Sequence, residues 1–203
     1  MYSQNQEEKY ILQFFGDFVG GLLDIGANDG FTFSNSMALI ERDWTADLVE
    51  PSPKAYKKLE KLYWGNHKVF VWNCAITEKT GESEFYESGP LISSKDIALV
   101  SSVKKTELER WSKIDFKKTK VGTMTINDLS NYADCPIWDF ISIDAEGYDL
   151  EILRQIDLTY TKLLCIEWNS IEETKKAILD YTSKFKMNKI LYTSGENLLI
   201  CQG

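Results

Sequence analysis

Apolar side chains recur along the chain at two alternating spacings, one typical of helices and the other of buried strands. Helical spacing predicts helices over about 7–18, 33–40, 53–62, 147–155 and 171–185. Short apolar runs predict strands at 21–26, 46–50, 69–72, 140–144 and 163–168. This alternation is typical of an α/β protein with a doubly wound sheet, in which helices cover both faces of parallel strands.

Two segments depart from the alternation. Strands predicted at 189–192 and 198–201 are joined by residues 193–197, a connection short enough only for an antiparallel hairpin. We therefore expect a mostly parallel sheet with an antiparallel C-terminal strand. Between about 77 and 124 the pattern breaks, with an extra strand at 81–87 followed by serine-rich and lysine-rich stretches. We expect this segment to be an insertion over the active face of one domain, 1–203.

Composition and charge exclude several classes of protein. Hydrophobic residues make up 43% of the chain and charged residues 27%, which is typical of a globular domain and excludes a disordered one. The net charge of -8 argues against general binding to nucleic acid. No apolar run approaches the roughly 18–20 residues of a membrane-spanning helix. The polar, acidic start MYSQNQEEKY does not resemble a signal peptide, so we expect a cytoplasmic protein.

The cysteines and the one histidine show no metal or redox motif. Cys74, Cys135, Cys165 and Cys201 are far apart with no CxxC, and only His67 offers an imidazole. Three of them (Cys74, Cys165 and Cys201) fall in apolar runs, where reduced cysteine packs as a small hydrophobe. His67 precedes the third strand at the end opposite to a ligand site, so we expect it in a surface loop.

A glycine-containing turn follows the first predicted strand, where an open parallel sheet binds its ligands. The turn reads Asp24-Ile25-Gly26-Ala27-Asn28-Asp29-Gly30. Glycine lets a ligand approach the backbone closely, but Asn28 stands where a dinucleotide-binding GxGxxG motif has glycine. The turn therefore suits a ligand without a pyrophosphate. The alternative is a tight strand-to-helix turn with no ligand.

Polar residues at the next two strand ends point to a nucleoside. Glu50 comes about twenty residues after the glycine turn, where a carboxylate accepts hydrogen bonds from both ribose hydroxyls. A solvated carboxylate before Pro51 is the alternative interpretation. Asn73 and Ala75 leave the third strand, where an amide and a backbone N–H can contact an adenine edge.

The ordered set of these motifs resembles the FkbM-type S-adenosylmethionine-dependent methyltransferases. The resemblance rests on the segments 23–30, 49–51, 73–76 and 143–147, and on Ser3-Gln4 and Ser101-Ser102. It implies a class I methyltransferase fold with a Rossmann-like sheet and S-adenosyl-L-methionine as cofactor. It also implies that Asp24, Gly26, Asn28 and Gly30, with Ala27 in the same turn, hold the methionine part of the cofactor. Glu50 would bind the ribose, Asn73 and Ala75 would flank adenine, and Asp144 would lie beside the reacting methyl group.

The expected reaction is methyl transfer to a hydroxyl, for which Asp144 and Glu146 are the candidate proton acceptors. Asp144, Glu167 and Asn169 also form an all-oxygen set that suits a hard divalent cation, although a metal is not the favoured interpretation. Otherwise Glu167 and Asn169, with Ser102, are candidates for hydrogen bonding to the substrate, or Glu167 and Asn169 cap the following helix.

The identity of the acceptor is the most open question in the sequence. Seven basic residues between Lys104 and Lys120 indicate either a solvated helix face or a surface that guides an anionic acceptor. Trp111 and Phe116 in this stretch suit stacking on a sugar ring or burial in the core. We expect a sugar or glycan acceptor. The alternatives are a nucleic-acid methyltransferase, a nucleotide-binding protein without catalysis and a dinucleotide oxidoreductase.

Overall fold

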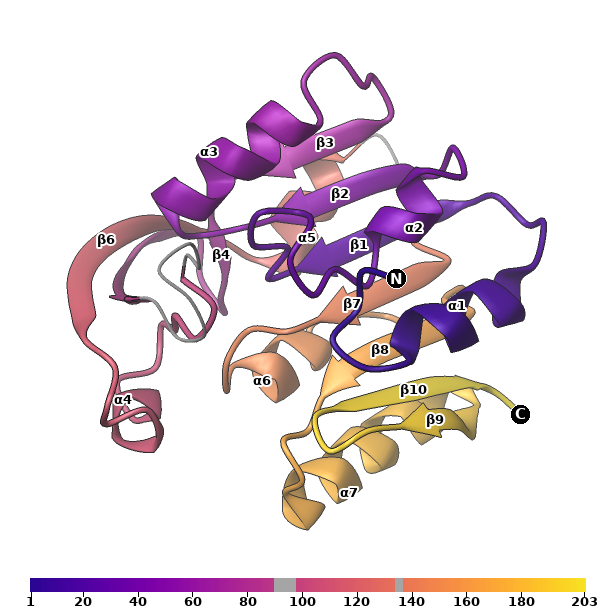
Figure 1. Ribbon diagram of the computed structural model, residues 1–203. Helices are drawn as coiled ribbons and strands as arrows, with labels where there is room; N and C mark the ends of the chain where they lie inside the picture. Colours follow the sequence, from indigo (N-terminus) through magenta and orange to yellow (C-terminus); the bar gives the residue numbers. More distant parts are fainter. Residues whose placement is uncertain (90–97, 134–136) are drawn as a thin grey trace.

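Seven strands form the main sheet of the computed structural model, which describes residues 1–89, 98–133 and 137–203 (Figure 1). They are β1 (Gly21–Ile25), β2 (Thr45–Val49), β3 (Val69–Trp72), β7 (Phe140–Ile143), β8 (Leu163–Glu167), β9 (Met187–Thr193) and β10 (Asn197–Gln202). Their order across the sheet is β3-β2-β1-β7-β8-β10-β9. The first five pair in parallel, and β10 is antiparallel to both β8 and β9. This confirms the predicted doubly wound sheet with its antiparallel C-terminal strand.

Helices cover both faces of this sheet and enclose two apolar cores. On one face lie α1 (Glu7–Phe15), α2 (Met37–Ile40) and α3 (Pro53–Leu62). On the other face lie α5 (Ile126–Tyr132), α6 (Asp149–Leu153) and α7 (Glu172–Thr182), which continues into the 3₁₀ turn η1 (Ser183–Phe185). Successive strand residues alternate between the two cores, as Leu22 and Leu23 do in β1. The strands are therefore apolar on both faces, which explains their continuous hydrophobic runs.

Several helices are shorter than the apolar spacing predicts. α1 ends at Phe15 because Gly16 adopts a φ of 54°, which leaves Phe18 outside the helix. α2 begins only at Met37, since Phe33 has a φ of 57° and lies in the connection after β1. The predicted helix over 33–40 is therefore wrong for its first half. α6 covers only the middle of the predicted 147–155.

A second sheet occupies the region where the alternation breaks. It has three strands in the order β4-β6-β5: β4 (Ala75–Ile76), β6 (Phe116–Met124) and β5 (Gly81–Ser88). It lies beside the edge at which the parallel strands end (Figure 1). The connection between β5 and β6 contains the short helix α4 (Glu107–Arg110) and residues 90–97, which are outside the described part of the chain.

The end of the lysine-rich stretch is strand and not a helix face. Lys117, Lys118 and Lys120 lie on β6, which pairs antiparallel with β5. Lys118 and Lys120 form ion pairs with Glu84 and Glu82 of β5. The helix face expected for this stretch is therefore wrong for its last three lysines, where cross-strand charge pairs form instead.

The cysteine and histidine predictions hold within the described residues. Cys74, Cys165 and Cys201 are buried as free thiols, and burial raises the pKa of each. Cys135 is not among the described residues. His67 is exposed in the turn before β3. Within the described part of the chain, no helix combines the length and apolar character needed to cross a membrane.

A buried carboxylate in the middle of β2 accepts hydrogen bonds from two distant tryptophans. Asp47 on β2 is fully buried, and its two oxygens accept hydrogen bonds from the indole nitrogens of Trp72 at 3.0 Å and Trp138 at 2.9 Å. The two tryptophans precede and follow the second sheet in sequence. Asp47 therefore ties both ends of that insertion to β2.

Candidate active site

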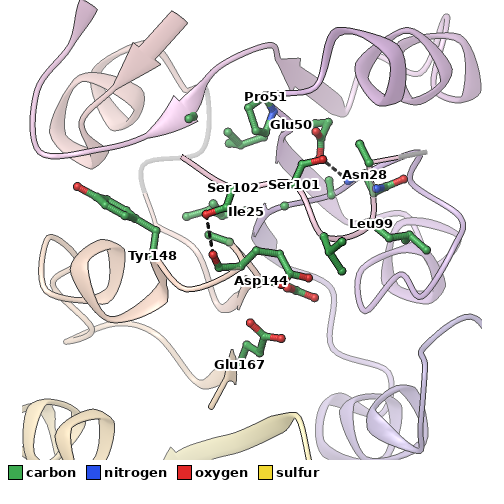
Figure 2. A pocket seen from close by; sticks show the side chains of 18 of the residues that line it. Ile25, Asn28, Glu50, Pro51, Leu99, Ser101, Ser102, Asp144, Tyr148 and Glu167 are labelled. Atoms are coloured by element: carbon green, nitrogen blue, oxygen red, sulfur yellow. Dashed lines mark hydrogen bonds between the residues drawn. The ribbon is translucent and has the colours of Figure 1, made fainter. Parts of the chain in front are cut away.

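A pocket lies at the carboxyl ends of β1, β2 and β7, under residues 98–103 (Figure 2). Most of the residues predicted from the sequence line it, namely Asp24, Gly26, Ala27, Asn28, Glu50, Ala75, Ser102, Asp144, Glu146, Glu167 and Asn169. Figure 2 shows Glu50 and Asn28 on one side of this pocket, with Asp144 and Glu167 further toward β8. The parallel topology accounts for this convergence, because residues far apart in sequence leave neighbouring strands at the same edge.

The turn after β1 is held by a close contact that only glycine permits. Gly26 has a φ of 89°, and a Cβ on it would lie 1.8 Å from the backbone oxygen of Asp144. The turns after β1 and β7 are therefore packed backbone to backbone. Asn28 also has a left-handed φ, of 49°, a conformation that asparagine tolerates better than most residues. The backbone N–H of Asn28 donates to Glu50 Oε2 at 2.9 Å, which joins this turn to the end of β2.

Asp24 and Glu50 are buried carboxyl groups with raised pKa values. Asp24 accepts a 2.6 Å hydrogen bond from Ser36 Oγ, and burial raises its pKa to about 6. Burial also raises the pKa of Glu50 to about 8, against the hydrogen bonds from the backbone N–H groups of Ser52 and Asn28. Each carboxylate oxygen has two lone pairs, so Glu50 retains acceptor capacity on both oxygens. A ligand with hydroxyl groups or positive charge would offset the cost of burying these groups.

The turn after β7 points Glu146 into the pocket. Glu146 has a φ of 46°, and Gly147 after it has a φ of 88°. Asp149 at the start of α6 stabilises this turn by accepting hydrogen bonds from the backbone N–H groups of Ala145 at 2.8 Å and Gly147 at 3.0 Å. A left-handed glutamate costs about 1 kcal/mol or more, and such strain is concentrated at functional sites. Asp149 is therefore a positioning residue for Glu146.

The acidic groups after β7 and β8 raise one another's pKa values. Burial raises the pKa of Asp144 to about 7, with further contributions from Asp149, Asp24 and Glu196. Burial, and then the charge of Asp144, raise the pKa values of Glu146 and Glu167 well above the ordinary range. These carboxyl groups are therefore poised to hold protons near neutral pH or to bind positive charge.

Asn169 and Arg110 meet at the outer side of the pocket. Arg110 of α4 donates a 2.7 Å hydrogen bond from Nη2 to Oδ1 of Asn169, and its Nη1 lies 3.6 Å from Glu107 Oε2. The guanidinium favours the charged forms of Asp144 and Glu146. Asn169 therefore directs its acceptor oxygen to Arg110, while its side chain favours the charged form of Glu167.

Residues from the insertion close the pocket. Ser102 donates a 2.8 Å hydrogen bond from Oγ to the backbone oxygen of Glu146, which fastens the segment 98–103 to the β7 turn (Figure 2). Trp111 lines the pocket, and its buried Nε1 has no hydrogen-bond partner among the described residues. Phe116 is on β6 and is not part of the lining.

Two predicted cofactor residues lie outside the pocket lining. Gly30, with a φ of 76°, packs against α3, where a Cβ would lie 2.6 Å from Leu59 Cδ1. Asn73 donates from Nδ2 to the backbone oxygens of Glu50 at 2.8 Å and Pro51 at 3.2 Å. Both positions shape the strand ends that carry the lining residues.

The lining also includes residues that the sequence does not single out as site residues, among them Gln4, Arg110, Tyr148 and Glu196. Gln4 comes from the N-terminal segment and Glu196 from the β9–β10 turn, and Asn5 Nδ2 donates to Glu196 at 3.3 Å. Their place in the pocket depends on contacts between the two ends of the chain, for which spacing gives no signal. Two of the four have a sequence signal, Gln4 in the N-terminal motif and Arg110 in the basic stretch.

The sequence profile of the methyltransferase FkbM domain matches residues 24–188. The chain belongs to this family. The match covers every strand end that contributes to the pocket described above except the β9–β10 turn. No curated protein sequence matches the chain.

Solved structures show the same fold at low sequence identity. The METTL16 MTase domain is 11% identical with a TM-score of 0.52 over 96% of this chain and 65% of that one. The N-terminal domain of human METTL16 is 13% identical with a TM-score of 0.50 over 97% and 66%. A caffeoyl-CoA O-methyltransferase candidate from Staphylococcus aureus is 13% identical with a TM-score of 0.50 over 98% and 84%. This FkbM-family chain spans just under two thirds of the METTL16 chains.

Proposed function

We propose that this FkbM-family protein, with residues 1–203 as one domain, transfers a methyl group from S-adenosylmethionine to a hydroxyl of a sugar or glycan. The observation that carries the proposal is the convergence of Asp24, Glu50 and Asp144, from the ends of three neighbouring strands, on one pocket. S-adenosylmethionine, when bound, supplies an electrophilic methyl group on a positively charged sulfur. The chemistry of this acidic lining fits such a ligand, because carboxylates stabilise a neighbouring positive charge.

Each residue has a proposed part in binding. Glu50 accepts hydrogen bonds from the ribose hydroxyls, while Asp24 and the 26–28 turn hold the methionine portion. Ala75, and Asn73 through its grip on the Glu50 and Pro51 carbonyls, shape the adenine side. Alignment of donor and acceptor in a closed pocket accounts for much of the rate in such a displacement.

The acceptor hydroxyl must lose its proton as its oxygen is methylated. Asp144 and Glu146 are the proposed proton acceptors, since both line the pocket and have raised pKa values. A carboxylate oxygen of either residue takes the hydroxyl proton. Glu167 is a proposed hydrogen-bond acceptor for the other acceptor hydroxyls, and Ser102 and Asn169 fix the surrounding backbone and Arg110.

Trp111 supports a carbohydrate acceptor over the nucleic-acid alternative. It offers the pocket an aromatic side chain together with a buried N–H donor, a combination that suits a sugar ring and its hydroxyl oxygens. Two of the lysines expected to guide an anionic acceptor, Lys118 and Lys120, instead form ion pairs with acids on β5. A contiguous basic surface of the kind that nucleic acid requires is therefore not supported by this stretch.

Thermal unfolding with S-adenosylmethionine, S-adenosylhomocysteine or NAD tests the cofactor part. At a hundredfold excess over its Kd a specific ligand adds about 2.7 kcal/mol, which raises the Tm by roughly 5–10 °C for a chain of this size. We expect this shift with the adenosyl ligands and not with NAD. Glu50→Ala should abolish it, whereas Glu60→Ala, at an exposed acid on α3, should leave it unchanged. A shift with NAD alone would contradict the proposal.

The acceptor part needs a turnover assay. Release of S-adenosylhomocysteine is followed with free sugars, oligosaccharides, other hydroxylated metabolites and RNA. We expect turnover with a carbohydrate, and Asp144→Asn should lower kcat by about 10²-fold or more while leaving the adenosyl thermal shift in place. Turnover with RNA and not with carbohydrate would overturn the glycan assignment.

A further inference from the structure

Three carboxyl groups meet at the β7 and β8 side of the pocket. One oxygen each from Asp144, Glu146 and Glu167 lie within 4.8 Å of one another. Asp144 and Glu146 follow β7, whereas Glu167 ends β8. Figure 2 shows Glu167 directed from below toward Asp144. The cluster is therefore built from two adjacent strand ends and is fixed by the sheet.

Two of these groups have buried oxygens with nothing to bind. Glu146 is 9% exposed and Glu167 is 8% exposed, and Oε2 of each has no hydrogen-bond partner among the described residues. A buried polar atom left unpaired costs about 1–3 kcal/mol, and more when it is charged. Native proteins rarely retain such atoms without a ligand or a functional reason. The two unpaired oxygens therefore indicate a ligand that can accept electron pairs from both of them.

Among the described residues, the cations around the cluster do not supply that occupant. Arg110 is the cation that acts on Asp144 and Glu146, and its guanidinium is already engaged by Asn169 and Glu107. A neutral sugar offers hydroxyl donors but no charge to offset three carboxylates. A small cation offers both charge and coordination, so it fits the cluster better than hydroxyl groups alone.

The spacing of the oxygens suits a hard divalent cation. Bond lengths of about 2.0–2.1 Å for Mg²⁺ place ligand oxygens roughly 3–4 Å apart, and those of about 2.3–2.6 Å for Ca²⁺ place them up to about 5 Å apart. The observed spread of up to 4.8 Å accommodates the larger ion directly and the smaller one after a small side-chain rotation. Glu146 replaces Asn169 in the all-oxygen set that the sequence indicated, since Asn169 Oδ1 is engaged by Arg110.

We propose that Asp144, Glu146 and Glu167 bind one hard divalent cation, and that this cation binds two neighbouring oxygens of the acceptor, so the acceptor carries adjacent hydroxyls. The cation site stands on its own geometry, whereas its role toward the acceptor rests on the proposed methyl transfer. Coordination lowers the pKa of the bound hydroxyl. The proton passes to the uncoordinated oxygen of Asp144 or Glu146, the acceptor oxygen forms its bond to the methyl carbon, and the carbon–sulfur bond breaks with its electron pair going to sulfur.

Titration of EDTA-stripped protein with Mn²⁺, followed by the electron paramagnetic resonance signal of the free ion, tests the site. Calorimetry with Mg²⁺ and Ca²⁺ gives the ion preference. We expect one Mn²⁺ per chain, with affinity at least tenfold weaker in Glu167→Gln and in Glu146→Gln. Glu82→Gln is the matched control, because Glu82 is 71% exposed on β5 and pairs with Lys120. The proposed cation site would be overturned if the wild-type protein did not bind one Mn²⁺ per chain. It would also be overturned if both pocket variants bound Mn²⁺ with the wild-type affinity.

A second pair of readouts separates this inference from the proposed function. The Tm shift with S-adenosylhomocysteine is measured in EDTA, and turnover is compared between cis-diol acceptors and their mono-deoxy analogues with and without Mg²⁺. A retained shift with loss of turnover in EDTA, restored by Mg²⁺ for the diol, supports the role in acceptor binding. Full turnover in EDTA overturns that role even where Mn²⁺ binds. Loss of the adenosyl shift in every condition counts against the proposed function and leaves the Mn²⁺ result to decide the cation site.

Discussion

Two groups of buried carboxyls in this protein differ in what their oxygens contact. Asp47, in the middle of strand β2, is fully buried and accepts hydrogen bonds from Trp72 and Trp138. Glu146 and Glu167, at the carboxyl ends of the central strands β7 and β8, are nearly as buried, but each keeps an oxygen without a partner among the described residues. Burial alone therefore does not mark a functional acid. An unsatisfied buried oxygen is the stronger indication, because native proteins rarely keep such an atom without a ligand or a functional reason.

Asp47 and the pocket acids are similarly buried but have opposite effects on stability. Asp47 stabilises the fold, since its removal would leave two buried indole N–H groups without a hydrogen-bond acceptor. The pocket acids lower the stability of the unliganded protein, since each is more costly to ionise inside than in water. Such a trade between stability and activity is common at ligand sites.

Asp47→Ala should cause the largest loss of stability. It leaves the Nε1 donors of Trp72 and Trp138 unpaired, so we expect the free energy of unfolding to fall by about 3 kcal/mol. Urea unfolding measures this loss, and Asp180→Ala, at an exposed acid on α7, is the control. A loss below about 1 kcal/mol would show that Asp47 does not brace the sheet, and the contrast with the pocket would then be lost.

Much of the fold follows from local sequence pattern. The strands ending at Ile25, Val49 and Ile143 are apolar runs, and parallel topology then places Asp24, Glu50 and Asp144 at one edge. Residues that reach the site through the strand order alone were therefore predictable. The family profile agrees with that interpretation over most of the chain.

Contacts between distant segments cannot be predicted from the local sequence pattern. The lysines of β6 look helical until their cross-strand partners on β5 are known. Asp47 gives no signal because its tryptophans lie 25 and 91 residues away. The left-handed conformation of Glu146, which turns it toward Glu167, depends on Asp149 and on the packing of Gly26 against Asp144. Tertiary contacts of this kind override local preference.

Stability should fall as pH rises, because Glu50 binds its proton more tightly in the folded state. Its pKa is about 8 when folded and near 4.5 otherwise, so between these values the folded state holds more protons than the unfolded state. Stability contributed by this proton is fully present below about pH 4.5 and is lost as pH rises through 8. Between pH 6 and 8 we expect a loss of about 2 kcal/mol from Glu50 alone, with a smaller one from Asp24, whose pKa is about 6.

Urea unfolding of ligand-free protein at several pH values between 6 and 8 measures this slope. Glu50→Gln should make the slope smaller whatever the variant's absolute stability, because its side chain does not titrate. The remaining slope comes from other buried acids such as Asp144, whose pKa is about 7. The control Glu60→Gln should keep the wild-type slope, since Glu60 is exposed. An unchanged slope in Glu50→Gln would assign the pH dependence to other groups and weaken the contrast between bracing and pocket acids.

Lys118→Ala should have the smallest effect, since its partner Glu84 is an exposed acid on the surface of the second sheet. The side chains of this ion pair are 58% and 55% exposed, and solvent and salt screen such pairs. We expect the Tm to change by less than about 2 °C. The KM for the acceptor should also stay within about twofold, because Lys118 does not line the pocket. Should Lys118→Glu instead raise the KM severalfold, the lysine strand would guide an anionic acceptor, and electrostatics outside the pocket would join the buried acids in determining function.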